Sequence, residues 1–309
     1  MTHLMRTYLL TAVLLLFAPQ AQSTRVPPPT VVPGAQLTVV YSSDQYFEGP
    51  SWDPAGQKLY FTAFEKENEQ ILRLDAPGKV TLWLDHTKGM NGTYLSRNGR
   101  LLIAQAFGHT LSSVKIGAVG PEDIKVLASD FEGIPFIQPN DVAESLVTGG
   151  IYFSDPNFKG KTRSAVYYLS PSGTVLKVID NLKLPNGLEV SNDGTTLYVS
   201  DSFEKRVYSY PILADGSVDQ AQVKIFFDPA TDNMADPDGM CSDALGNLYF
   251  AMRGGVWVVS KEGKQLGFIP VTEFASNVTF GGVDGQTLYI TCDKKVYSLA
   301  MRVKGAQFR

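Results

Sequence analysis

Six copies of one hairpin pattern constrain the fold of this chain more than any other feature. Each copy has a turn rich in Gly, Asp or Asn, followed by a strand-like run that starts with Leu or Ile and often continues with Tyr. Repeats of this length, each with several short strands, are typical of β-propeller blades. The runs start about 40 to 51 residues apart, at Leu59, Leu101, Ile151, Leu197, Leu248 and Leu288.

Further strand patterns and turns follow each of these runs, and no segment after residue 23 has a helical period long enough for a helix. We therefore predict an all-β, six-bladed β-propeller with four-stranded blades over residues 35–303. The last repeat has fewer strand patterns than the others. Residues 36–41, in contrast, form a strand pattern without a partner in their own repeat. An N-terminal strand that completes the last blade would close the ring. A pair of β-sandwiches explains neither feature.

Residues 1–23 have the pattern of a signal peptide. Arg6 precedes an apolar run over residues 8–18, and the small residues Ala21 and Ser23 follow. The alternative, an uncleaved membrane anchor, is disfavoured because the run is short for a bilayer span. Residues 24–34 are rich in proline and are expected to be an extended linker. These patterns predict an exported protein, periplasmic or secreted, that does not associate with a membrane after the signal is removed.

Composition narrows the classes of partner. The net charge of -4 provides no basic surface for nucleic acid, and the 44% hydrophobic content is that of a soluble globular protein. We expect a monomer that acts on a small molecule. Cys241 and Cys292 occupy non-equivalent places in their repeats, which favours buried free thiols; a disulfide stays open at this point.

One position of the repeat carries a carboxylate or a carboxamide in every copy. In a propeller this position is the entrance to the innermost strand, so the six side chains are expected to converge on one mouth of the central channel. The six residues are Glu48, Asn91, Asn140, Asn186, Asp238 and Asn277.

A ring of carboxylate and amide oxygens is suited to a hard cation. Ca²⁺ accepts six to eight oxygen ligands in flexible geometry, and Mg²⁺ or another divalent ion stays possible. Zinc and copper are disfavoured because no histidine or cysteine occupies this position in any repeat. The alternative reading is that Asn-Gly and Pro-Asp-Gly only make turns.

The motifs around these residues resemble, in order and spacing, the senescence marker protein / gluconolactonase / luciferin-regenerating enzyme family. The resemblance covers roughly residues 35–300 and rests on Glu48-Gly49-Pro50, Pro139-Asn140-Asp141, Ser154-Asp155-Pro156, Pro185-Asn186-Gly187 and Pro237-Asp238-Gly239. It implies a six-bladed propeller with one catalytic Ca²⁺ in the channel and the hydrolysis of sugar lactones; some relatives act on phosphoesters and other lactones.

The resemblance also implies roles for residues. Glu48, Asn186 and Asp238 would be metal ligands, with Asn140 as a further ligand or a substrate contact. The metal would polarise the lactone carbonyl for attack by water. Asp238 would be the catalytic group that activates this water, or alternatively only a ligand.

The substrate-binding residues predicted on this basis are Asn91, Asn140, His109 and Asn277. His109 lies where family members often carry a histidine near the pocket. The acidic residue that usually precedes it is replaced by Gln105.

Two other function classes stay open from the sequence. Propellers also serve as non-enzymatic platforms that bind ligands or proteins. A strictosidine-synthase-like enzyme is a further alternative, although that chemistry relies on a pocket glutamate rather than on a ring of metal-type residues. The identity of the lactone or ester is not predicted by any motif.

Overall fold

The computed structural model describes residues 26–64, 69–160, 164–229 and 236–308. Within these ranges, nearly all regular structure consists of antiparallel strands, and the two helices are single 3-10 turns, η1 (Gln220–Gln222) and η2 (Ala306–Phe308). The all-β prediction is confirmed. Among the described residues, no helix has the length and apolar character needed to cross a bilayer. The predicted signal peptide lies outside the described residues.

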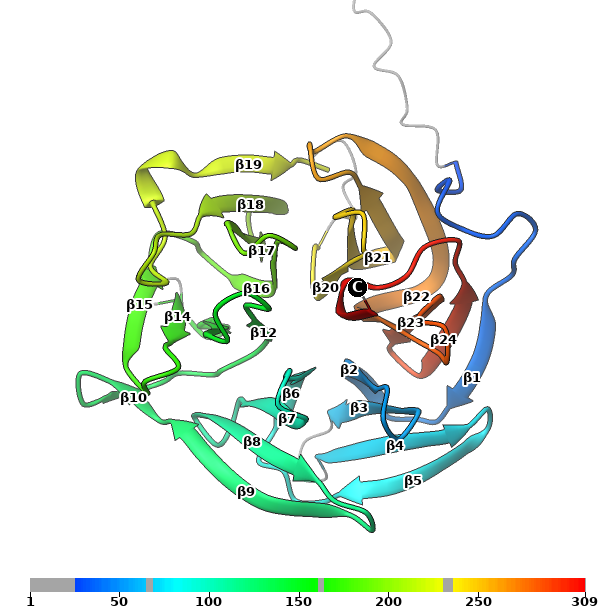
Figure 1. Cartoon of the computed structure of the whole chain (residues 1–309), viewed down its shortest axis with the longest axis horizontal. Coiled ribbons are helices and arrows are strands. Elements are labelled where there is room, and N and C mark those ends of the chain that lie inside the picture. Colours follow the sequence, from blue (N-terminus) through cyan, green and yellow to red (C-terminus); the bar gives the residue numbers. More distant parts are fainter. Residues whose placement is uncertain (1–25, 65–68, 161–163, 230–235, 309) are drawn as a thin grey trace, which may run out of the picture.

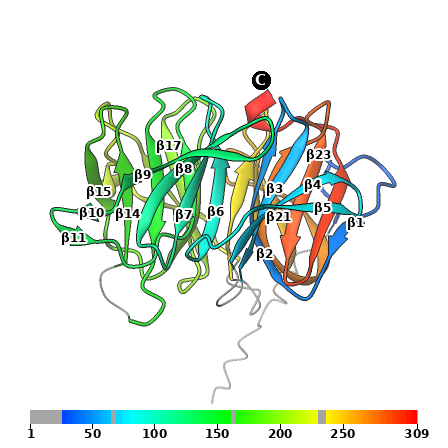
Figure 2. The ribbon, with the colours of Figure 1, turned by 90° about the horizontal axis from the view of Figure 1, so that it is seen from below.

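Five sheets stand around a central axis (Figures 1 and 2). In each four-stranded sheet, the strand that comes first in the sequence lies nearest to this axis. Four of them are four-stranded meanders. The first contains β2 (Tyr46–Asp53), β3 (Lys58–Phe64), β4 (Gln70–Ala76) and β5 (Lys79–Leu84). The second contains β6 (Met90–Leu95), β7 (Arg100–Gln105), β8 (Thr110–Ile116) and β9 (Pro121–Ala128).

The third sheet contains β12 (Val142–Glu144), β13 (Ile151–Asp155), β14 (Ala165–Leu169) and β15 (Val175–Ile179). The fourth contains β16 (Pro185–Val190), β17 (Thr196–Asp201), β18 (Arg206–Pro211) and β19 (Lys224–Phe227). The fifth has six strands in the order β1-β24-β23-β22-β21-β20. These are β1 (Thr38–Ser42), β20 (Met240–Ser242), β21 (Leu248–Val259), β22 (Gln265–Gly281), β23 (Thr287–Cys292) and β24 (Lys295–Ala300). A separate two-stranded hairpin, β10 (Asp130–Phe131) with β11 (Ile134–Pro135), lies at the periphery of the ring (Figure 1).

The prediction of six separate four-stranded blades is wrong, because the propeller has five blades. The cause is β22, a continuous strand of 17 residues. It pairs with β21 as far as Phe274 and with β23 from Ala275 onward. The outer strand of the fifth repeat therefore runs without a break into the inner strand of the sixth, and the two repeats share one sheet.

The N-terminal strand closes the ring, as predicted. Strand β1 pairs antiparallel with β24, with Thr38 opposite Ser298. The chain just before β1 also follows this sheet, since the Val32 N–H donates to Ala300 O and the Arg302 N–H donates to Thr30 O. Val40 of β1 is buried together with Phe47 and Val296, so this strand joins the packing of the first and last sheets.

Apolar side chains between neighbouring sheets form the core. Five of the six hairpin leucine or isoleucine positions are fully buried there, namely Leu59, Leu101, Leu197, Leu248 and Leu288. At about 25 cal/mol for each Å² of apolar surface removed from water, such contacts are the main stabilising term. Because they hold each sheet against the next, they also fix the inner strands around the channel.

Candidate active site

Five of the six predicted channel residues line one cavity. Its volume is about 440 Å³, and it contains Glu48 on β2, Asn91 on β6 and Asn186 on β16, together with Asn140 and Asp238, which lie two positions before β12 and β20. All except Asn91 are at least nine-tenths buried. The repeat position therefore does bring side chains from distant parts of the chain to one end of the channel.

Glycines that follow these residues let neighbouring sheets approach closely. A Cβ on Gly187 would lie 2.1 Å from Asp238 O, and a Cβ on Gly49 would lie 2.3 Å from Asn91 O. In both cases the space is filled by the backbone of the channel residue in the next sheet. The Asn-Gly and Glu-Gly pairs are thus more than turn signals, because they set the separation between consecutive site residues. The sequence signal was a glycine directly after the site residue in four of the six repeats.

The Gly187→Ala variant is expected to lose stability and activity, because a methyl group at this position would overlap Asp238 O. Overpacking of this kind costs about 1–3 kcal/mol in the free energy of unfolding. Urea unfolding would measure the first effect, and an assay of the hydrolysis that the family resemblance implies would measure the second. Gly120→Ala is the matched control, since no atom lies within 4 Å of its added Cβ. Equal behaviour of the two variants would contradict the assigned role of Gly187.

The hydroxyl groups of Ser200 and Ser202 link the segment that carries Asn186 to the segment that carries Asp238. The Asn186 amide Nδ2 donates to Ser202 Oγ at 3.2 Å, and Ser202 Oγ donates to Pro237 O at 2.8 Å. Ser200 Oγ donates to Asp238 O at 3.0 Å. Strand β17 therefore reaches across to the segment that carries Asp238, and the nitrogen of the Asn186 amide is used in this network.

Two buried carboxylates fix the loops that lead into the site. Asp201 accepts hydrogen bonds from the Lys183 and Leu184 N–H groups, just before Asn186. Asp155 accepts from the Ile137 and Gln138 N–H groups, just before Asn140. Both aspartates end the second strand of their sheet. Their carboxylates hold the backbone of these loops in place.

Glu48 and Asp141 are two buried carboxylates that repel each other, although only Glu48 lines the cavity. Tyr46 Oη donates to Glu48 Oε1 at 3.3 Å, and the Gly49 N–H donates to Glu48 Oε2 at 3.3 Å. Asp141, which the sequence analysis did not assign, is 5% exposed and accepts hydrogen bonds from the Val142 N–H and Asn277 Nδ2. It is visible in the sequence only as the neighbour of Asn140.

Three carboxyl groups are thus buried without a basic partner, two that line the cavity and Asp141 beside it. Burial raises the pKa of Asp238 well above its ordinary value, and repulsion by Glu48 and Asp141 adds to this. Burial, followed by repulsion from Asp141, raises the pKa of Glu48, and burial raises the pKa of Asp141 to about 7. Across the described ranges, no lysine, arginine or histidine forms an ion pair with any of the three.

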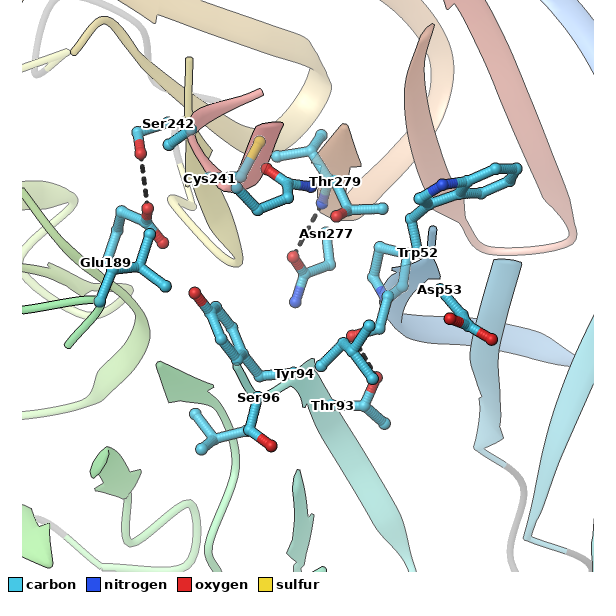
Figure 3. A pocket seen from close by; sticks show the side chains of 18 of the residues that line it. Trp52, Asp53, Thr93, Tyr94, Ser96, Glu189, Cys241, Ser242, Asn277 and Thr279 are labelled. Carbon is cyan, nitrogen blue, oxygen red and sulfur yellow. Dashed lines mark hydrogen bonds between the residues drawn. The ribbon is translucent and has the colours of Figure 1, made fainter. Parts of the chain in front are cut away.

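Asn277 is not in this cavity. It lines a second cavity of about 470 Å³ in the other half of the channel, together with Trp52, Tyr94 and Glu189 (Figure 3). Its Oδ1 accepts a hydrogen bond from the Val278 N–H at 2.8 Å, which folds the amide back along its own strand. Its Nδ2 donates to Asp141 Oδ2 at 3.4 Å, so Asn277 contacts a buried carboxylate beside the first cavity without lining that cavity.

His109 is also outside the cavity. Its Nδ1 lies 2.7 Å from Ile137 O, and its backbone has a left-handed φ of 55°. The imidazole therefore contacts the loop before Asn140 and is not among the residues that line the site. Both cysteines are free, and burial raises the pKa of each thiol, which disfavours the thiolate form that a nucleophile requires.

The donors in the cavity fit a hard cation. Glu48 and Asp238 supply carboxylate oxygens, Asn140 and Asn186 supply amide oxygens, and no histidine or cysteine lines this cavity. In the part of the chain that the structure describes, no cluster of three or more His, Cys, Asp and Glu side chains has the form of a metal centre. A mixed set of carboxylates and amides is the type that Ca²⁺ accepts, and a divalent charge would offset the buried carboxylates.

A match to one family model shows which family this chain belongs to. Residues 47–294 match the model of the SMP-30/Gluconolactonase/LRE-like region, a range that includes every residue that lines the cavity except Tyr46. The chain belongs to this family. The family resemblance inferred from the Glu-Gly-Pro, Pro-Asn-Asp and Pro-Asn-Gly motifs is confirmed.

Members of the SMP-30/gluconolactonase family similar to this chain include two curated enzymes and one solved structure. A gluconolactonase from Zymomonas mobilis is 28% identical over 302 residues, covering 87% of this chain and 82% of the relative. Pentonolactonase XacC from Haloferax volcanii is 27% identical over 256 residues, covering 82% and 83%. The structure of a gluconolactonase from Xanthomonas campestris superimposes with a TM-score of 0.77 at 27% identity, covering 89% of this chain and 95% of that one.

Proposed function

We propose that this protein is a metal-dependent lactone hydrolase that acts on sugar lactones. The observation that carries the proposal is the cavity in which two buried carboxylates and three asparagine amides meet at one end of the channel. The relatives named as a gluconolactonase and a pentonolactonase support a cyclic ester as the substrate. A cavity of about 440 Å³ has the size of a site for a small molecule.

Glu48, Asn186 and Asp238, with Asn140, are the residues that would hold a Ca²⁺ ion. When bound, this cation supplies Lewis-acid polarisation of a carbonyl oxygen. The residues fit it because the Asn186 amide is oriented by its bond to Ser202, and Glu48 is oriented by Tyr46 Oη and the Gly49 N–H.

The chain's own groups position the substrate and move the proton. Asn91 and Asn140 line the cavity and can donate amide N–H bonds to the ring and carbonyl oxygens of a lactone. The Asp238 carboxylate can accept the proton of the attacking water at one of its Oδ atoms and later return it to the ring oxygen that leaves. The alternative role for Asp238 is that of a ligand only.

The test is hydrolysis of D-glucono-δ-lactone and of aliphatic and aryl lactones by the calcium-loaded protein. Rates must be corrected for spontaneous opening of the ring in the same buffer. Turnover that is lost on chelation and restored by Ca²⁺ would support the proposal. Absence of turnover with every lactone would instead favour a propeller that binds ligands without reacting with them.

We further propose that the protein is exported and monomeric. Export is supported by the signal-peptide pattern of residues 1–23, and the low charge and ring closure within one chain are compatible with a monomer. Cell fractionation of the full-length chain, with sequencing of the mature N-terminus, and light scattering of the purified protein would test these two points.

The calcium-free protein is expected to become less stable as the pH rises. Asp141 has an ordinary pKa of 3.8 that burial raises to about 7, so the folded state holds this proton more tightly than the unfolded state. Stability from this group is therefore fully present below pH 3.8 and is lost as the pH rises through about 7. Thermal unfolding in excess chelator between pH 5 and pH 8 would show the fall in Tm, by about 5 °C, since each kcal/mol shifts Tm by roughly 2–4 °C. A Tm that rises over this range would contradict the burial of a protonated acid.

A further inference from the structure

Arg253 lies at the active-site cavity, and its chemistry differs from that of the other residues there. Of the described residues that line this cavity, Arg253 alone has a basic side chain, and this side chain is 51% exposed. The cavity also contains Asp236, Phe158 and Phe274. The buried end of the site is thus formed by Glu48 and the asparagines, and these four residues form a more open part of its wall.

A bulge in β21 directly follows Arg253 and lies beside the cavity that Arg253 lines. The register of β21 against β22 shifts between Arg253 and Gly255. Gly254 has a φ of +88° and Gly255 a φ of +148°, and a Cβ on Gly255 would lie 2.1 Å from Ile269 O. The two glycines allow a bulge that residues with side chains would resist, and bulges commonly re-aim a neighbouring side chain beside an active site.

The guanidinium group is held on two sides. Nη2 lies 3.4 Å from Asp236 Oδ2, and the guanidinium carbon lies 5.2 Å from the centroid of the Phe274 ring. The carboxylate contacts one nitrogen of the group, and the cation lies over the aromatic ring. A guanidinium has five N–H donors in a fixed fork, so an arginine held in this way presents its remaining donors in a defined direction.

We propose that Arg253, paired with Asp236, selects lactones that carry ring hydroxyl groups over lactones that carry none. A hydroxyl group both donates and accepts hydrogen bonds, and an arginine beside a carboxylate offers both complements. Asp236 is shared, because its Oδ1 lies 4.0 Å from Lys205 Nζ while its Oδ2 faces Arg253, so the pair keeps donors and an acceptor close together at the cavity. Phe158, 47% exposed, supplies an apolar surface in the same cavity. This inference rests on the proposed lactonase function.

The competing explanation is that the pair is an ordinary surface ion pair. Exposed ion pairs contribute little to stability, about 0–1 kcal/mol, so removing this one should leave the fold intact. A site built to bond a hydroxyl group, in contrast, discriminates strongly against an analogue without it. The two explanations therefore differ in substrate selectivity and not in stability.

The experiment compares two lactones with the same six-membered ring, D-glucono-δ-lactone and δ-valerolactone, using the calcium-loaded protein. In Arg253→Gln, kcat/KM for the sugar lactone should fall by about 10- to 100-fold, the range for one hydrogen bond to a charged group. Most of the loss should be a rise in KM, and kcat/KM for δ-valerolactone should stay within about 2-fold. Asp236→Asn should give a smaller loss of the same kind. The matched control is Arg206→Gln, because Arg206 is also paired with an aspartate, Asp228, but does not line the cavity.

Equal losses on both lactones, or no loss on either, would overturn the selectivity role of Arg253. A wild-type protein that hydrolyses neither lactone would overturn the proposed lactonase function itself, and the inference with it. Circular dichroism and Tm of each variant would confirm that the comparison is made between folded proteins.

Discussion

The Asp238→Asn variant is expected to retain its fold and lose almost all lactone hydrolysis. Loss of a general base typically costs about 10²- to 10⁴-fold in kcat, and an amide cannot accept a proton from water. The side chain keeps an oxygen that can contact a cation, and it keeps nearly the same shape inside a position that is 8% exposed. The kcat at saturating Ca²⁺, with metal content measured in the same sample, would show the effect.

Asp228→Asn is a suitable control, because Asp228 is a surface residue in an ion pair with Arg206. It should behave as the wild type. If Asp238→Asn binds the metal and hydrolyses lactones at the wild-type rate, the base role is excluded and Asp238 is only a ligand. If it loses the metal as well as activity, titration with higher Ca²⁺ concentrations would separate the two contributions.

Removal of Ca²⁺ is expected to have the second large effect. Chelation should abolish measurable hydrolysis and lower Tm, because Glu48, Asp141 and Asp238 are then buried without a compensating charge. A ligand present at 100 times its Kd stabilises a folded protein by about 2.7 kcal/mol. For a domain of this size this corresponds to roughly 5–10 °C in Tm. Calorimetry with and without chelator, and an activity assay after Ca²⁺ is added back, would measure both.

The Glu48→Gln variant should reproduce much of the chelated state even with Ca²⁺ present, since one of the two carboxylate ligands is lost. The matched control is Glu262→Gln in an exposed turn, which should respond to Ca²⁺ as the wild type does. Full activity in excess chelator would refute a metal-dependent mechanism. An identical Tm with and without Ca²⁺ would refute binding in this cavity.

Local pattern in the sequence was sufficient to predict the hairpins but not the number of blades. Turn residues and the buried leucines Leu59 and Leu197 act within one repeat, so each hairpin could be predicted from a short window. Whether two consecutive strand patterns form one long strand depends on the distant strands with which they pair. Strand β22 changes partner between Phe274 and Ala275 without a turn, and no local signal distinguishes this from two separate strands.

The site was predictable to the extent that a repeat position fixes where a backbone lies. This placed Glu48, Asn140 and Asn186 at one end of the channel. It did not fix side-chain directions, and so Asn277, which bonds its own Val278 N–H, faces the other half of the channel. His109 differs for a similar reason, because a backbone carbonyl, and not the cavity, holds its ring.

Asp141 was not predicted because the prediction used one position of each repeat, and Asp141 occupies the next position. In the third repeat the residue after the channel asparagine is an acid and not the glycine found in four other repeats. That departure is the signal that could have revealed a third buried carboxylate. Arg253 had no sequence signal of its own, since its position depends on the bulge in β21.

The pairing of β1 with β24 also affects how the molecule folds. Thr38 pairs with Ser298, so the contact that completes the ring joins residues from almost opposite ends of the described chain. Contacts between residues so distant in sequence form slowly, because a large loop must close first. During synthesis or export, β1 emerges long before its partner and has an unpaired edge in the meantime. We therefore expect the ring to close late in folding, with the edge of β1 open to aggregation until β24 has formed.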